Sequence, residues 1–416
     1  MTAAAQVVGP AGPRSPRIAV LYTPLLAPGG AERQALEELR WLREFGHEAT
    51  LLTFELGDAG LFVGGADHAA VRVLGARSVP GRVVALRRVL REGFDVLVSH
   101  TSPELTWLAT RGLELPYVLY HDDTLAYLYA GASSAPLRYR RFFRTKDAPE
   151  LRDLGRRPGL SLAAECRALL KHRALRDAEA VLVLSEQARR ELRAVHRVDA
   201  TMVRACLAPE LLQRVPGPAA SRAELGLPAG PLVLSVCRLH PVKRLDLLIR
   251  AFVRVRATAP DALLVLVGDG PERDRLAALA RSAGVAEAVR FCGPIPDGEL
   301  WSYYAAADVF AAPTVADFNI APYEALALGC RVVCAPNMEV EPEIDASGWL
   351  FRAPPGEEPL ATTLVEALQA TRPKPIDLSG MTWESRNRRV ANLCIEVWSR
   401  RAGRPMATLV ATHEGS

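Results

Sequence analysis

The sequence predicts an α/β protein built from two doubly wound domains with a cleft between them. Short β-branched or apolar runs alternate with longer amphipathic stretches along the chain, as they do where helices join parallel strands. The chain has 416 residues, more than one hydrophobic core usually holds, so two domains are expected. In such domains, ligands bind outside the carboxyl ends of the strands.

The strand candidates form two groups. The first contains RIAVLY (17–22), ATLLTF, DVLVS, PYVLYH and AVLVLS; the second contains PLVLSVC, ALLVLVG, AVRFCG, DVFAAP and RVVCA. Stretches such as RLDLLIRAFVRVRATA and PERDRLAALARSA predict helices within the second group. Between the groups, residues 208–231 are rich in Pro, Ala and Gly and poor in pattern, so we place the domain boundary there.

Composition excludes several classes of protein. Hydrophobic residues make up 49% of the chain and charged residues 24%, as in ordinary soluble enzymes. A net charge of +4 is too small to indicate a nucleic-acid partner. The seven cysteines show no CxxC pair and no histidine at ligand spacing, so we expect reduced thiols and no zinc site. Neither a signal peptide nor a run of about 18 apolar residues is visible, so we expect a cytoplasmic protein.

A basic pair follows the first strand of the second group. In SVCRLHPVKRLD, Arg238 and Lys243 leave the carboxyl end of a strand just before a helix. A guanidinium fork, a mobile ammonium and a helix N-terminus all attract a diphosphate. Spacing alone leaves a solvated basic turn as an equal alternative.

Two glycine turns also lie at strand ends. VGDGPERDRL lacks GxGxxG spacing, so the lone GDG is weak evidence for a ligand and indicates a tight turn first. In LLAPGGAERQ, Gly29 and Gly30 begin a helix, where bare amides can approach an anion or a sugar. A glycine turn with a helix cap explains that stretch equally well.

These motifs, in their order, resemble the retaining glycosyltransferases of family 4. They are GGAER, VLYHDD, CRLHPVKRLD, VGDGPER, FCGPIPDGELWSYYAAADVFAAPT and DFNIAPYEALALGCRVV. The resemblance covers about residues 17–400 and implies the GT-B fold, two facing Rossmann-like domains. It implies a flexible tail (1–16), an acceptor domain (17–215), a nucleotide-sugar donor domain (225–381), a helix that packs back on the N-terminal domain (382–400) and a second tail (401–416).

The resemblance assigns roles to residues that match family motifs. Arg238 and Lys243 match the Arg and Lys that hold the donor's diphosphate, although Cys237 and Arg244 replace two glycines of that motif. Glu324 matches a glutamate whose carboxylate accepts hydrogen bonds from the ribose hydroxyls.

Further matches concern the transferred sugar. The backbone amides of Asn319, Ile320 and Ala321 would lie against the sugar and the β-phosphate, with Asn319 standing where glycine is common. Gly30 matches the N-terminal glycine loop, and His121 matches the histidine near the transferred sugar. His121 could instead be a hydrogen-bonded histidine at a strand end.

One position departs from the family pattern. Aligning DFNIAPYE with the family motif puts Ala316 where a first glutamate normally holds hydroxyls of the transferred sugar. Asp317 could partly take over that role, or it could be a surface or cap residue. After RVVCAPN, the common glycine pair is also absent, and Glu343 is only a candidate match for a later glutamate.

The function implied is a retaining hexosyltransferase of the EC 2.4 type. It would move a sugar from a nucleotide-diphosphate sugar to an acceptor hydroxyl on a glycan, a lipid-linked molecule or a small molecule. No Asp-x-Asp motif is visible, so neither a metal nor another cofactor is expected. A catalytically degenerate nucleotide-sugar-binding protein and a sugar-nucleotide epimerase remain open, and no residue identifies the base, the sugar or the acceptor.

Residues 137–177 form a basic segment in which Tyr139, Phe142 and Phe143 are interleaved with arginines. Such a segment could dock peripherally on an anionic membrane or bind an acidic acceptor. A solvated helical face or a flexible lid is the simpler interpretation.

Overall fold

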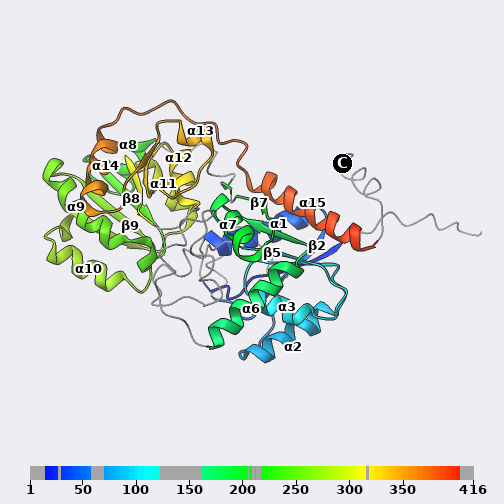
Figure 1. Cartoon of the computed structure of the whole chain (residues 1–416). Helices are drawn as coiled ribbons and strands as arrows, with labels where there is room; N and C mark the ends of the chain where they lie inside the picture. The colour runs from blue at the N-terminus through cyan, green and yellow to red at the C-terminus, as the bar shows by residue number, and fades with distance from the viewer. Residues whose placement is uncertain are drawn as a thin grey trace, which may run out of the picture. The chain divides into compact units, whose positions relative to one another are not determined.

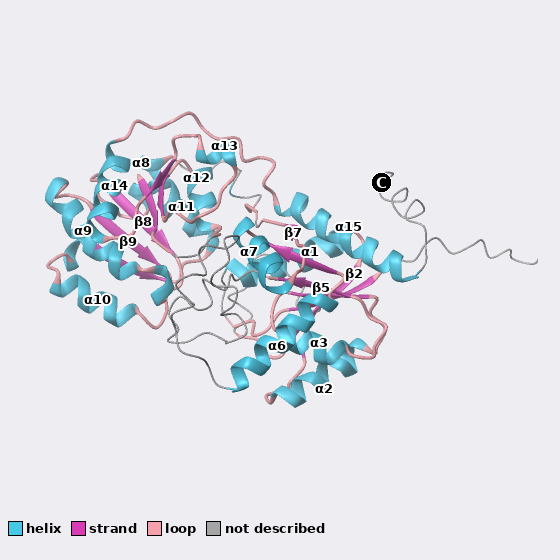
Figure 2. Cartoon of the chain, in the orientation of Figure 1, coloured by secondary structure: helices cyan, strands magenta, loops and turns pink. Residues whose placement is uncertain are grey.

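The protein is described here from a computed structural model, which covers residues 15–26, 30–57, 70–121, 162–204, 206–208, 211, 217–314 and 318–402. The chain divides into two compact units (Figure 1). The first unit comprises Met1–Tyr120, Leu169–Leu182 and Asn387–Ser416; the second comprises His121–Ala168 and Val183–Arg386. Strands alternate with helices along the chain (Figure 2). The domain limits expected from the sequence stay a prediction.

The first sheet contains seven strands in the order β3-β2-β1-β4-β5-β6-β7. The strands are β1 (Arg17–Leu21), β2 (Glu48–Thr53), β3 (Val71–Val73), β4 (Val96–Ser99), β5 (Tyr117–Tyr120), β6 (Ala180–Val183) and β7 (Thr201–Met202). Its central pairings, β2 with β1, β1 with β4 and β4 with β5, are parallel. The helices are α1 (Gly30–Glu44), α2 (Val79–Leu90), α3 (Pro103–Thr110), α6 (Leu162–Asp177), α7 (Glu186–Glu191) and the π-helical turn η4 (Leu192–His196).

A buried polar cluster joins α1 to the ends of β4 and β5. The Tyr120 hydroxyl donates to Glu38 Oε2 at 2.6 Å, and His100 Nε2 lies 3.4 Å from Glu38 Oε1. The His100 ring stacks on Tyr120 with 4.0 Å between centroids. The side chains of Glu38 and His100 are fully buried, and the hydrogen bond from Tyr120 offsets part of the cost of removing the Glu38 carboxylate from water.

The second sheet contains six strands in the order β10-β9-β8-β11-β12-β13. The strands are β8 (Leu232–Val236), β9 (Leu263–Val267), β10 (Val289–Gly293), β11 (Val309–Ala312), β12 (Arg331–Cys334) and β13 (Leu350–Arg352), and all their pairings are parallel. The helices are α8 (Pro218–Glu224), η6 (Pro241–Lys243), α9 (Leu245–Thr258), α10 (Arg273–Ser282), η7 (Ala286–Ala288), α11 (Asp297–Ala306), α12 (Ala321–Ala327), α13 (Pro342–Asp345) and α14 (Glu357–Gln369).

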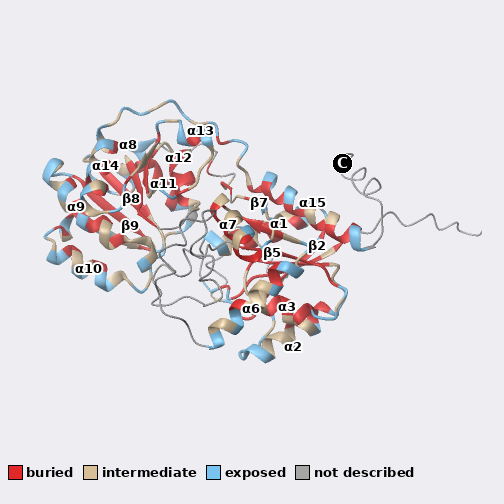
Figure 3. Cartoon of the chain, viewed as in Figure 1, coloured by how far each residue is buried: buried red, intermediate tan, exposed pale blue. Residues whose placement is uncertain are grey.

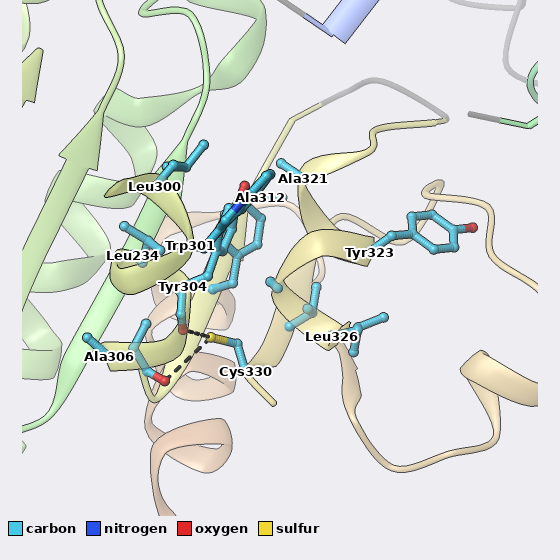
Figure 4. Close-up of a cluster of buried hydrophobic side chains, with 14 of the residues drawn as sticks. Leu234, Leu300, Trp301, Tyr304, Ala306, Ala312, Ala321, Tyr323, Leu326 and Cys330 are labelled. Atoms are coloured by element: carbon cyan, nitrogen blue, oxygen red, sulfur yellow. Dashed lines mark hydrogen bonds between the residues drawn. The ribbon is translucent and has the colours of Figure 1, made fainter. Parts of the chain in front are cut away.

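Both faces of the second sheet are covered by helices. Leu234 and Val265 pack on one face with residues of α11 and α12, whereas Val233 and Leu264 pack on the other with residues of α9, α10 and α14. This alternation is the period-two pattern of a strand that is buried on both sides. Burial is accordingly deepest along the strands (Figure 3). Figure 4 shows side chains from the sheet face that α11 and α12 cover. There Cys330 Sγ contacts the carbonyl oxygen of Tyr304 at 2.8 Å.

The strand order of the second sheet reverses at β8. The chain runs from β8 through β9 to β10 at one edge, then returns to β11 and runs through β12 to β13 at the other. The carboxyl ends of β8 and β11 therefore flank the topological switch point, where doubly wound sheets bind their ligands. The predicted fold class is confirmed, and this geometry locates the candidate site.

All ten strands expected from the sequence are present. Three strands were not expected: β3, β7 and β13, each of two or three residues at a sheet edge. The segment proposed as the domain boundary, residues 208–231, is poor in pattern, yet it includes the seven-residue helix α8. Pro218 explains the start of that helix, because proline suits its first turn.

The last helix, α15 (Trp383–Ala402), belongs mostly to the first unit. There the Arg388 guanidinium lies 4.4 Å from the centre of the Phe45 ring, and Arg401 pairs with Glu179 at 3.5 Å. Within the described part of the chain, no helix combines the length and the apolar composition needed to span a bilayer.

Candidate functional site

A small pocket opens at the switch point of the second sheet. It is lined by Ser235 and Cys237 from the end of β8, Lys243 from η6, Thr314 from the end of β11, and Asn319 from the segment before α12. Of the residues predicted to bind the diphosphate or the sugar, Lys243 and Asn319 thus share one pocket. The sequence spacing could not predict that these two residues lie close together. They are separated by 75 residues, and only the fold brings them to one end of the sheet.

The loop after β8 is fixed on both sides of Arg238. The backbone N–H of Cys237 donates to the Val267 carbonyl at 3.0 Å, and that of Leu239 donates to the Asp269 carbonyl at 2.9 Å. Arg238 itself is exposed. Its guanidinium therefore extends from a rigid backbone into solvent, as a group that receives a ligand must do.

The GDG turn supplies this support through close packing. A Cβ atom on Gly268 would lie 2.1 Å from the Cys237 carbonyl oxygen, and one on Gly270 would lie 2.4 Å from the Leu239 carbonyl oxygen. Both glycines have positive φ, +119° and +159°. The turn expected from VGDG is thus confirmed. Its backbone packs against the residues on both sides of Arg238.

Lys243 ends the 3₁₀ turn η6. The His240 side chain caps this turn by accepting from the Val242 N–H at 3.4 Å, and the Thr314 hydroxyl donates to the Val242 carbonyl at 3.2 Å. The Thr314 contact ties the Lys243 turn to the end of β11. The half-buried Lys243 side chain is thereby held at the pocket.

Arg244, the next residue, has a left-handed backbone with φ 53° and ψ 36°. A residue with a Cβ atom pays about 1–2 kcal/mol for this conformation, which glycine adopts freely. We expect Arg244→Gly to raise the free energy of unfolding by about 1 kcal/mol. Urea denaturation would measure the change. Arg244→Ala is the control, since it removes the charge but keeps the strain; equal stability of both variants would contradict the prediction.

Glu324 lies in the first turn of α12 and is buried, with 3% of its surface exposed. The Tyr304 hydroxyl, from α11, donates to Glu324 Oε2 at 2.8 Å. A buried carboxylate needs such a partner, because desolvation penalises its charge. The contact fixes the carboxylate's orientation.

Removing the Tyr304 hydroxyl should therefore affect both stability and nucleotide binding. We expect Tyr304→Phe to lower the free energy of unfolding by about 1–3 kcal/mol, the value of a buried hydrogen bond to a charged group. Nucleoside diphosphate affinity should fall with it, because Glu324 loses its fixed orientation. Chemical denaturation and titration calorimetry would measure the two effects.

The neighbouring Tyr303 provides the control for that variant. Its hydroxyl interacts with Cys292 and not with Glu324. Tyr303→Phe should leave nucleotide affinity unchanged. If Tyr304→Phe also binds nucleotides normally, Tyr304 does not orient Glu324 for a ligand.

The other predicted residues fall into three groups. Ile320 is the N-cap of α12 and Ala321 is its first residue, so both adjoin Asn319. Gly30 begins α1, and the buried His121 follows β5, each at a strand end or helix start of the first sheet. Asp317 and the neighbouring Ala316 lie outside the described residues. The hypothesis that Asp317 compensates for Ala316 therefore stays untested.

Sequence reasoning missed Tyr304 and the supporting role of Gly268. Nothing in the helix containing Tyr304 distinguishes a tyrosine that orients a carboxylate from one that packs in the core. For Gly268 a signal existed, since a glycine at a strand end often marks close backbone approach.

The comparisons with known proteins agree with this geometry. Residues 219–369 match the family of glycosyl transferases group 1, and residues 29–207 match the glycosyl transferase 4-like domain. The chain therefore carries two glycosyltransferase domains. The segment that matches this family contains every pocket residue named above.

Two curated relatives of this glycosyltransferase-domain protein are similar over part of its length. The GDP-mannose-dependent alpha-(1-6)-phosphatidylinositol monomannoside mannosyltransferase of Mycolicibacterium smegmatis is 41% identical over 120 residues, 27% of this chain and 31% of the relative. The D-inositol 3-phosphate glycosyltransferase of Mycolicibacterium gilvum is 31% identical over 254 residues, 58% of this chain and 51% of the relative. The chain thus spans between about a third and a half of these two relatives.

Solved structures share the fold. The sucrose-phosphate synthase from Thermosynechococcus elongatus superposes with a TM-score of 0.71 over 93% of this chain and 100% of that chain, at 19% identity. The likeness supports the GT-B architecture of two parallel-sheet Rossmann-like domains. Within the described ranges, no group of three His, Cys, Asp or Glu side chains could hold a metal ion.

Proposed function

We propose that the protein transfers a sugar from a nucleotide-diphosphate sugar to an acceptor hydroxyl, with retention of the anomeric configuration. The observation that carries this proposal is the pocket at the switch point, where Lys243 and Asn319 meet beside the rigid Arg238 loop. Arg238 and Lys243 would hold the diphosphate, and the buried Glu324 would accept hydrogen bonds from the ribose hydroxyls.

The proposed chemistry is a front-face displacement. The bond between the anomeric carbon and the β-phosphate oxygen breaks while the acceptor oxygen bonds to the same face of that carbon. The acceptor's proton passes to the leaving diphosphate, whose growing negative charge is stabilised by Arg238 and Lys243. Preorganised charges of this kind often supply the largest single part of an enzyme's rate enhancement.

The relatives suggest which substrates to try first. One is named as GDP-mannose-dependent and as acting on a phosphatidylinositol monomannoside, and another as acting on D-inositol 3-phosphate. We propose a glycan, a lipid-linked molecule or a small polyol as the acceptor. Gly30, the first residue of α1, and His121, which follows β5, would contact the transferred sugar.

A second candidate is a nucleotide-sugar-binding protein without transferase activity. Ala316 favours it, because this position lacks the carboxylate expected to hold the transferred sugar. Asp317 would have to replace that carboxylate for full activity. Product formation separates the two candidates: the enzyme releases nucleoside diphosphate in the presence of an acceptor, and the binding protein does not.

The first test is thermal unfolding with UDP, GDP, ADP and dTDP, repeated on Arg238→Ala. A nucleotide at about 100 times its dissociation constant should stabilise the folded protein by about 2.7 kcal/mol. We expect one nucleotide to stabilise the native chain more than the variant. If none does, the proposed diphosphate site is wrong and transferase activity loses its basis.

We further propose that transfer requires no metal ion, because Arg238 and Lys243 provide the positive charge that a cation would otherwise supply. A rate unchanged by EDTA supports this, and a rate lost with EDTA and restored by Mg²⁺ refutes it.

We propose a cytoplasmic location with peripheral membrane contact through residues 137–177, of which the structure describes only α6. Flotation with anionic liposomes tests that contact.

A further inference from the structure

Two pocket side chains stand where the family resembled by this sequence has glycine. Cys237 replaces a glycine of the phosphate-binding motif, and Asn319 replaces a glycine before α12. The two residues lie far apart in the sequence, yet both line the pocket that contains Lys243. Side chains therefore occupy space that glycine would leave open to a ligand.

Cys237 is held in the pocket as an uncharged group. Burial raises the pKa of its thiol to about 11, although the charge of Lys243 acts in the opposite direction. At neutral pH the thiol therefore keeps its proton and places no negative charge beside Lys243. The hydrogen bond from its backbone N–H to the Val267 carbonyl, 3.0 Å, fixes the main chain of the residue. A phosphate in the pocket would contact the uncharged, nearly apolar side chain of Cys237.

Asn319 contributes hydrogen-bond donors from a different segment of the chain. Its carboxamide carries two N–H donors and one acceptor, whereas a glycine would offer only its backbone. The residue is half-buried, and it lines the same pocket as the Lys243 ammonium. An anion that contacts Lys243 there lies beside a neutral donor group as well, and hydrogen bonds to an anion are stronger than those between neutral groups.

We propose that Cys237 and Asn319 are specificity-determining residues of this phosphate pocket. The Asn319 amide donates to a phosphate oxygen of the anion that Lys243 contacts, and the Cys237 side chain limits how deeply that phosphate enters. This inference rests on the proposed function, since it takes the pocket to hold the donor's diphosphate.

Titration calorimetry on the full chain tests the Asn319 part. The probe is whichever of UDP, GDP, ADP and dTDP binds the wild type most tightly. Asn319→Asp is equal in size but carries a negative charge in place of the N–H donors, so it should weaken binding about 10- to 100-fold, and Asn319→Gly less than about 10-fold. Effects of Lys243→Met and Asn319→Gly should be non-additive by at least about 3-fold, as for two groups that share a ligand atom.

The Cys237 part is tested by the ratio of dissociation constants for a nucleoside diphosphate and its sugar nucleotide, UDP with UDP-glucose or GDP with GDP-mannose. Cys237→Gly should change this ratio at least about 5-fold, because the sugar-bearing phosphate can then move deeper into the pocket. Cys237→Ser, which keeps the size of the side chain, should leave the ratio within about 2-fold. Circular dichroism confirms that each variant folds.

The outcomes separate this inference from the proposed function. If the wild type binds none of the nucleotides, the proposed function itself fails. If the wild type binds and Lys243→Met does not, the function stands; the inference is then overturned when Asn319→Asp and Asn319→Gly bind equally, or when Cys237→Gly leaves the ratio unchanged. The inference is also overturned if substitutions at only one of Asn319 and Cys237 change nucleotide binding as expected, because both residues are proposed to determine specificity.

Discussion

Arg238→Ala should lower kcat by about 10²- to 10³-fold, a loss of about 2.7–4 kcal/mol of transition-state stabilisation. The guanidinium would act on negative charge that grows on the leaving diphosphate, so its effect is larger in the transition state than in the bound donor. Release of nucleoside diphosphate at saturating donor and acceptor measures kcat. The backbone of the Arg238 loop is anchored by hydrogen bonds that do not involve the side chain, so the variant should fold normally.

Two further variants make this result specific. Arg238→Lys keeps the charge but loses the planar fork, so it should recover only part of the activity. Arg250→Ala removes an exposed arginine from α9 and should leave turnover unchanged. If Arg238→Ala turns over at near the native rate, the positive charge at this strand end does not serve the leaving group.

The central strands of both sheets were predictable because they are buried on two faces. β9 is a continuous apolar run and β8 is interrupted only by Ser235, since alternate residues such as Val233 and Leu234 pack into opposite helix layers. The missed strands, β3, β7 and β13, are short edge strands that no apolar run marks. In β3 the side chains of Arg72 and Val73 are exposed, so its sequence carries no strand signal.

The candidate site was predictable where a short motif carries the chemistry. Arg238 and Lys243 could be found because both charges follow one strand in a few residues. The partnership of Glu324 with Tyr304 could not be found, since it joins two helices and depends on how α11 packs against α12. Likewise, no local pattern shows that Cys237 and Asn319 share a pocket, because only the crossing connections of the sheet bring their segments together.

Gly268→Ala should destabilise the protein by about 2–6 kcal/mol. The backbone of Gly268, at φ +119°, costs a residue with a side chain about 1–3 kcal/mol. Overpacking adds about 1–3 kcal/mol, because the new Cβ would lie 2.1 Å from the Cys237 carbonyl oxygen, an atom of a hydrogen-bonded backbone. Urea denaturation would measure the loss of unfolding free energy. The folded variant should also bind nucleotides more weakly than the wild type.

Gly284→Ala separates strain from clash. Gly284 also has a positive φ, +72°, but no atom lies within 4 Å of the position its Cβ would take. It should cost about 1–2 kcal/mol through backbone strain alone and leave nucleotide affinity unchanged. A larger loss at Gly268, accompanied by weaker nucleotide binding, would mean that the GDG turn holds the Arg238 loop in its binding conformation. Equal losses at both positions, with normal binding, would mean that the loop can shift by the width of a methyl group without harm, and that Arg238 needs no rigid support to meet a diphosphate.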